Sequence, residues 1–108
     1  MASQQLANWG NHTMMTAHRE VDGEAEFHEN QADIFIAQSG EAVVEIGGSV
    51  DSPRTTAAGE IRGPSITGAT RNAVKAGDIL HIPAKTAHRV LVEPGKQFTY
   101  VVVKVSAK

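Results

Sequence analysis

Short runs of β-forming residues, separated by glycine, proline and asparagine, recur along this chain. Each run is shorter than ten residues and is rich in Val, Ile, Phe, Tyr and Thr, which is typical of strands in a compact sheet protein. The sequence therefore predicts an all-β fold without internal repeats. The six predicted strands cover residues 13–21, 33–37, 42–46, 78–82, 89–92 and 98–105.

The length of 108 residues suits a single hydrophobic core and is too short for two domains of ordinary size. We expect residues 1–12 to form an N-terminal arm or short helix, and residues 13–108 to form one domain. The helix is predicted over Ser3–Trp9, because Ser3 can cap its first turn and Gly10-Asn11 can end it. So short a helix needs to dock on the rest of the chain.

Ser39-Gly40 lies between two predicted strands and is expected to form a hairpin turn. If Asp33 points to the inner face of the first strand, alternation places Phe35 on the same face, whereas Ile34 and Ile36 face the opposite side. Both faces are then apolar. We expect the outer face to be covered by a second sheet or by a partner subunit.

Residues 47–76 are rich in turn formers and show little periodicity. A long irregular stretch in a small domain is usually a functional loop or a flexible excursion, and we interpret this one as a partly ordered lid or edge hairpin. It is expected to carry ligand specificity. The charged residues Arg54, Glu60 and Arg62 can close over a site, although loop charges of this kind are usually solvated.

The composition excludes several classes of function. The net charge of −2 and the scattered lysines and arginines argue against a nucleic-acid partner. No apolar run approaches the ~20 residues that cross a bilayer, so no membrane partner is expected. The absence of cysteine excludes disulfides and thiolate chemistry. With no signal sequence at the N-terminus, we expect a cytoplasmic protein, although a removed signal peptide would leave no trace.

Two segments about fifty residues apart, 26–33 and 77–88, gather histidines and carboxylates. Glu26 and His28 are separated by one residue, so on a strand they point to the same face. Asp33 follows where the next strand begins, and His88 follows a proline-led turn. Two imidazoles with carboxylate oxygens suit a divalent Fe, Mn, Ni or Zn ion. The alternative is that these are ordinary surface residues, with Asp33 serving as a turn residue or cap.

The other histidines are interpreted as structural or surface residues: His12, His18 and His81. His81 is the strongest of them as a residue near the site, because it lies within the second segment.

At these two segments the chain resembles the cupins, a family of small β-barrels. His28, Asp33 and Gly40 follow the spacing of the second half of the first cupin motif, and Pro83 and His88 follow that of the second motif. The resemblance covers roughly residues 13 to 105. It implies a cupin-type β-barrel, also described as a double-stranded β-helix or jelly roll, with a divalent metal inside. It also implies a homodimer.

The chain departs from the family pattern at several positions. Glu26 stands where the family has its first histidine, and Asp33 is one methylene shorter than the usual glutamate. If Asp33 falls short of the metal, Gln31 or a water can fill the gap. Lys85 replaces a glycine of the second motif, and Val92 replaces its asparagine. The resemblance therefore implies an unusual set of metal ligands.

The resemblance implies a metal-dependent enzyme, such as a dioxygenase-like oxidoreductase, that acts on a small organic molecule. Glu26 then completes the coordination or acts as a general base. Phe35 and Val90 are expected to line the pocket wall, with Gln31 and His81 as further pocket candidates. One alternative is a non-catalytic barrel that binds or senses a small ligand. Another is a metal-assisted isomerase or lyase that uses the same ligands.

Overall fold

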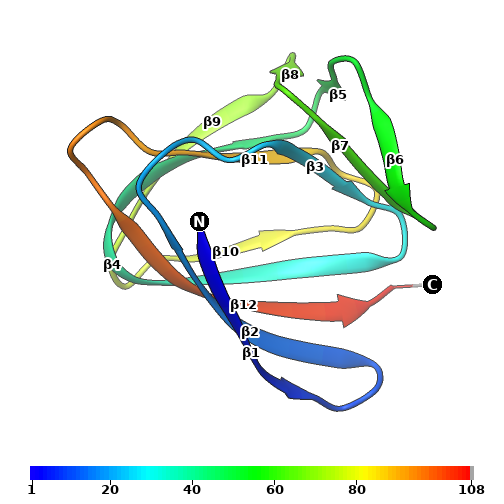
Figure 1. The fold of residues 1–108 in the computed structure, drawn as a ribbon, viewed down its shortest axis with the longest axis horizontal. Helices are drawn as coiled ribbons and strands as arrows, with labels where there is room; N and C mark the ends of the chain where they lie inside the picture. Colours follow the sequence, from blue (N-terminus) through cyan, green and yellow to red (C-terminus); the bar gives the residue numbers. More distant parts are fainter. Residues whose placement is uncertain (108) are drawn as a thin grey trace.

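The computed structural model describes residues 1–107, and its secondary structure consists of strands (Figure 1). All paired strands run antiparallel. The all-β prediction is therefore confirmed. The strands are β1 (Ala2–Asn8), β2 (His12–Arg19), β3 (Ala25–His28), β4 (Gln31–Ile46), β5 (Ser49–Val50), β6 (Arg54–Ala57), β7 (Glu60–Gly63), β8 (Ile66–Thr67), β9 (Thr70–Lys75), β10 (Ile79–Ile82), β11 (His88–Leu91) and β12 (Phe98–Ser106).

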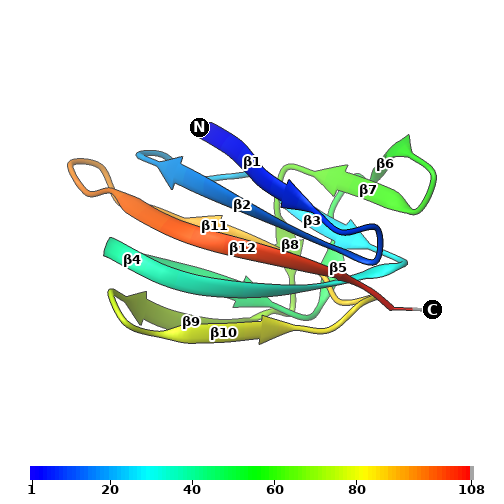
Figure 2. The same cartoon turned by 90° about the horizontal axis from the view of Figure 1, so that it is seen from below.

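Two sheets share strand β4 and curl around one core. The first has the order β1-β2-β12-β4-β10, and the second has the order β9-β4-β11-β3-β7-β6. Figure 2 shows β1, β2, β12 and β4 lying side by side in the first sheet. A separate ribbon pairs β5 with β8. This arrangement is the curled jelly-roll barrel that the resemblance to the cupins implies.

Strand β4 passes from one sheet into the other without a turn (Figure 1). Residues 31–40 pair with β12, and residues 41–46 pair with β9. The predicted hairpin at Ser39-Gly40 is therefore wrong. Gly40 has a φ of +79°, and a Cβ there would lie 1.8 Å from the backbone oxygen of Gln97. Glycine thus allows a sharp bend and a close backbone contact within a continuous strand.

The N-terminal segment forms strand β1, so the predicted helix over Ser3–Trp9 is wrong. β1 pairs with β2, for example Ser3 with Ala17, and most of its residues are exposed. The physical reason is that seven residues gain little from an isolated helix, whereas β2 offers a row of backbone hydrogen-bonding groups.

The turn-rich stretch 47–76 contains strands β5 to β9. β6 and β7 form an antiparallel pair at the edge of the second sheet, and β9 runs along β4. β7 also pairs with β3, which sets Glu60 opposite His28. The stretch therefore places Glu60 directly beside His28, a candidate metal ligand.

The core lies between the two sheets and follows the predicted alternation along β4. Asp33 and Phe35 are buried, whereas Ile34 and Ile36 are only partly buried, which confirms the predicted faces. The buried core residues are Ala17, Phe35, Ala37, Ala42, Val44, Val74, Ile82, Val90, Val92, Phe98, Tyr100 and Val102.

Within residues 1–107 there is no helix long and apolar enough to cross a membrane.

Candidate metal centre

Three buried polar residues lie close together at one end of the barrel interior. His28, Asp33 and His88 are each no more than 3 % exposed. They come from β3, β4 and β11, and the pairing of His88 with Glu26 joins β11 to β3. The alternation that buries Phe35 in β4 also turns Asp33 inward. The fold thus collects both predicted segments in one place.

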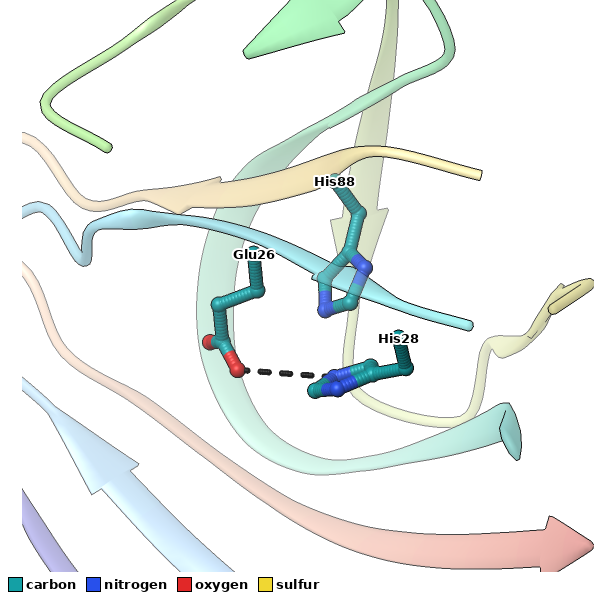
Figure 3. A group of neighbouring side chains, drawn as sticks. All are labelled: Glu26, His28 and His88. Atoms are coloured by element: carbon teal, nitrogen blue, oxygen red, sulfur yellow. Dashed lines mark ion pairs between the residues drawn. The ribbon is translucent and has the colours of Figure 1, made fainter. Parts of the chain in front are cut away.

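The ring nitrogens and carboxylate oxygens of this cluster face one another, and Figure 3 shows Glu26, His28 and His88 from their two strands. Asp33 Oδ2 lies 3.4 Å from His28 Nε2 and 3.4 Å from His88 Nε2. Glu26 Oε1 lies 3.6 Å from His28 Nε2. One ligand atom from each of Glu26, His28 and His88 lies within 4.8 Å of the others.

These separations fit a divalent metal. Nitrogen and oxygen ligands bind Zn at about 2.1 Å, and in a tetrahedron this bond length places neighbouring ligands about 3.4 Å apart. Asp33 Oδ2 is buried and has no hydrogen-bond partner among the described residues. Such a group normally has a partner, and a bound cation satisfies it. The donor set therefore fits a metal that accepts both nitrogen and oxygen.

Glu60 orients the ring of His28. The Nδ1–H of His28 donates to the Glu60 carboxylate, with distances of 2.7 and 2.9 Å to its two oxygens. This hydrogen bond keeps the proton on Nδ1 and leaves the lone pair of Nε2 directed at Glu26 and Asp33. A carboxylate behind a ligating histidine also raises the basicity of the imidazole.

Lys104 reaches into the cluster from β12. Its Nζ donates to Asp33 Oδ1 at 3.0 Å and lies 3.4 Å from His28 Nε2. Lys104 and Asp33 are direct partners in the β12–β4 register. The amine therefore holds one oxygen of Asp33 while the other faces the two histidines.

Two arginines surround the carboxylate of Glu26. Arg19 Nη2 lies 3.6 Å from Glu26 Oε2, and Arg62 Nη2 lies 3.5 Å from Glu26 Oε1. Arg62 also lies 3.5 Å from Glu60, and Arg19 Nε donates to the hydroxyl of Tyr100 at 3.0 Å. Glu26 is thus held between cations at the edge of the cluster.

Burial and charge set the protonation states. Burial lowers the pKa of His88, which favours the neutral, ligating form. Burial alone would raise the pKa of Asp33, but contact with His28 and the charge of Lys104 lower it to about 2. Burial also acts to lower the pKa of His28, and contact with Asp33 together with Glu60 reverses this, so that the pKa is raised. Asp33 is therefore ionised at neutral pH.

Of the predicted pocket residues, Phe35 contacts the cluster: it is buried with its ring edge against His88, at a centroid distance of 5.8 Å. Val90 is buried in the core two residues beyond His88. Gln31 is partly buried and has no hydrogen bond or ion pair with the cluster in the described chain. His81 is exposed and pairs with Ile34 on the outer face, so it does not reach the site.

Two charged residues at the site have no place in the sequence prediction: Arg19 and Lys104. Two others, Glu60 and Arg62, belong to the loop charges that the sequence predicts can close over a site. Lys104 had a signal, because it continues the inward alternation that begins at Phe98. Loop charges such as Glu60 and Arg62 are usually solvated, but here both contact the cluster. Their positions depend on the pairing of β7 with β3, for which the sequence carries no local signal.

A groove of about 560 Å³ lies elsewhere on the molecule, along β4, β9 and β11. It includes Val43, Ala73 and Leu91 and contains none of the cluster residues. Among the described residues, the groove has no buried polar side chain, whereas the barrel interior contains His28, Asp33 and His88. The barrel interior is therefore the candidate site.

No protein-family model matches the chain, and no curated protein matches its sequence. Solved structures do match it. A protein from Ralstonia eutropha JMP134, provisionally named a mannose-6-phosphate isomerase, matches with a TM-score of 0.68 at 20% identity, covering 98% of this chain and 84% of that one.

Two enzyme structures are also similar in fold. An oxalate oxidase matches with a TM-score of 0.68 at 20% identity, covering 97% of this chain and 50% of that one. Hydroquinone 1,2-dioxygenase from Sphingomonas sp. TTNP3 matches with a TM-score of 0.67 at 14% identity, covering 94% of this chain and 63% of that one. All three are cupin-fold proteins. The chain therefore has the cupin fold that its two motifs predict.

Proposed function

We propose that this protein is a metal-dependent enzyme of the dioxygenase-like oxidoreductase type, acting on a small organic molecule. The observation that carries the proposal is the buried set of donors on β3, β4 and β11, in which Asp33 Oδ2 lies 3.4 Å from both histidine Nε2 atoms. Fold similarity to an oxalate oxidase and a hydroquinone dioxygenase supports the reaction class by analogy.

In this function His28, His88 and Asp33 hold the metal, which is Fe(II) or Mn. The bound metal supplies Lewis acidity and open positions for substrate and O₂, as in other sites of two histidines and one carboxylate. Burial favours the neutral form of His88 by lowering its pKa. Glu60 fixes the tautomer of His28 through its hydrogen bond to Nδ1–H.

Glu26 has two possible roles in the proposed enzyme. It lies 3.6 Å from His28 Nε2, close enough to join the coordination, and it is less buried than the histidines. As a base, it would accept a proton from the substrate while Arg19 and Arg62 balance its charge. Glu26→Ala separates the roles: a ligand role predicts loss of metal affinity comparable with that of His88→Ala, and a base role predicts retained metal with lost turnover.

The test of the proposed function begins with elemental analysis of the purified protein. Anaerobic reconstitution with Fe(II) follows, and O₂ uptake is measured with an electrode in the presence of candidate substrates. We expect one metal per chain and substrate-dependent O₂ uptake. The proposal is overturned if the protein holds no metal, and if Mn, Fe, Ni and Zn change the thermal stability of wild type and His28→Ala equally. Metal binding with turnover but without O₂ uptake would instead favour an isomerase or lyase.

A second candidate function is a non-catalytic barrel that binds or senses a small ligand without a metal. The observation in its favour is Lys104, whose cation already pairs with Asp33 at 3.0 Å. A fixed ionic cluster of this kind satisfies part of the buried charge. Under this alternative, Lys104→Met destabilises the protein at every metal concentration. Under the enzyme proposal, a saturating metal compensates for the loss of the lysine.

We also propose that the protein forms a homodimer through the outer face of the first sheet. Ile36 pairs with Val101 and Ile34 pairs with Val103, and all four are only partly buried in the single chain. Neighbouring apolar residues of this kind gain from being covered. Light scattering is expected to give twice the mass of 11.5 kDa. Val101→Glu is expected to give the monomer, and a monomeric wild type would contradict the proposal.

A further inference from the structure

Strand β12 carries a cation into the candidate metal centre. Phe98, Tyr100 and Val102 alternate along its inner face and are buried, and Lys104 is the next residue on that face. It lies opposite Asp33 in the strand register. The side chain of Lys104 is 21% exposed, and its amine contacts Asp33 and His28. A ligand bound between these residues would therefore lie within reach of this amine.

The amine has more donors than it has partners once a metal is bound. Lys104 carries three N–H donors, and its acceptors within the cluster are Asp33 Oδ1 at 3.0 Å and His28 Nε2 at 3.4 Å. A metal held by His28 Nε2 uses the lone pair that accepts from Lys104. The bound metal thus frees a charged donor beside the metal position, and that donor needs a new acceptor.

The metal-loaded site carries a net positive charge. With both histidines bound to the metal as neutral rings, the three carboxylates and the three cations sum to zero, and the divalent metal brings the total to +2. A partly buried excess of positive charge favours an anionic ligand. The charged groups counted are Glu26, Asp33, Glu60, Arg19, Arg62 and Lys104.

We propose that the metal-loaded site binds a small carboxylate anion and that Lys104 donates to one of its oxygens. This inference rests on the proposed metal-dependent function and names its substrate class. A neutral molecule of the same shape, such as an amide, accepts one hydrogen bond through its carbonyl oxygen but leaves the excess charge uncompensated. The buried ring of Phe35 lies with its edge against His88 and is the apolar side chain that the non-polar part of such a ligand would meet.

The experiment uses Co²⁺ as the metal, because its visible spectrum reports changes in coordination. Co²⁺ affinity is measured first, by competition with a chromophoric chelator. The Co²⁺-loaded protein is then titrated with acetate and with its neutral analogue acetamide. The variants are Lys104→Gln and, as a matched control, Lys75→Gln, which changes an exposed lysine outside the cluster.

We expect wild type to bind acetate at least about tenfold more tightly than acetamide, since hydrogen bonds to charged groups contribute more than neutral ones. Lys104→Gln is expected to weaken acetate binding by about tenfold while Co²⁺ affinity is kept or increased, and Lys75→Gln to change neither. Equal binding of acetate and acetamide to the wild-type Co²⁺ protein overturns the inference without any variant. Unchanged acetate binding in a folded Lys104→Gln protein also overturns it. Failure of wild type to bind Co²⁺ overturns the proposed metal function and the inference together.

Discussion

The two ends of the barrel interior are built on the same strands but have opposite chemistry. Along β12 the inward residues Phe98, Tyr100 and Val102 are apolar, and the series ends at Lys104. β4 and β11 follow the same scheme, with buried apolar residues that lead to Asp33 and His88 respectively. The β12–β4 register sets Lys104 opposite Asp33, and the curl of the two sheets brings His88 Nε2 within 3.4 Å of Asp33 Oδ2.

This difference separates stability from function. At the apolar end, buried side chains gain free energy from leaving water. At the polar end, buried charges cost free energy unless they are paired, and one oxygen of Asp33 has no hydrogen-bond partner in the described chain. Buried charges that are incompletely paired are typical of sites for binding or catalysis. Substitutions at the two ends are therefore expected to affect different measurements.

The largest expected effect is on folding, at the apolar end. Phe98 is fully buried and stacks on Tyr100 at a centroid distance of 4.6 Å. Phe98→Ala removes this packing and leaves a cavity, so the free energy of unfolding is expected to fall by about 3–5 kcal/mol. Denaturant unfolding measures the change, and Val101→Ala on the outer face, with a smaller expected loss, is the control. If Phe98→Ala lowers the free energy of metal binding more than the free energy of unfolding, the two ends of the barrel do not act separately.

The apolar end is also the part that the sequence predicts best. Alternation of β-branched and aromatic residues identified β12, β2 and both halves of β4, because those residues favour strands wherever their partners lie. The errors occur where distant contacts decide the structure. Ser3–Trp9 has the local signals of a helix but pairs with β2, and Gly40 resembles a turn but bends a strand against Gln97.

The polar end is predicted only in part. The motif spacing identified His28, His88 and the two carboxylates, since each ligand type has a known chemistry and position along a strand. The partners that tune them come from the opposite sheet or from the 47–76 stretch. Glu60 reaches His28 only because β7 pairs with β3, and the register of a long-range pair cannot be read from one strand.

The second largest effect is expected on metal affinity, at the polar end. His88→Ala removes a ligand, and because even residues behind a ligand typically contribute 10–100-fold to affinity, the loss is expected to exceed about 100-fold. The matched control is His81→Ala, since His81 is exposed on the outer face. Competition with a chelator measures both variants. Equal affinities in His88→Ala and His81→Ala would place the metal, if any, outside the barrel.

Protonation of Asp33 at low pH is expected to destabilise the folded, metal-free protein. Burial opposes its charge, but contact with His28 and the charge of Lys104 lower its pKa from 3.8 to about 2. Because the folded pKa lies below the unfolded value, Asp33 stabilises the fold above about pH 4, and this contribution is lost as the pH falls toward 2. The loss is about 2 kcal/mol. Unfolding is compared with Asp33→Asn from pH 5 to 2, and identical pH dependence in both proteins would contradict the assignment.

The smallest expected effect tests the residue behind the metal ligand. Glu60→Gln keeps the shape of the side chain but removes the charge that accepts from His28 Nδ1–H at 2.7 Å. Metal affinity is expected to fall by about tenfold, because the imidazole becomes less basic and its tautomer less fixed. Glu24→Gln is the matched control, since Glu24 is an exposed glutamate that pairs with Arg54. Chelator competition distinguishes the two. An equal effect in both variants would mean that Glu60 acts only through general surface charge, and the contact with His28 would then have no part in holding the metal.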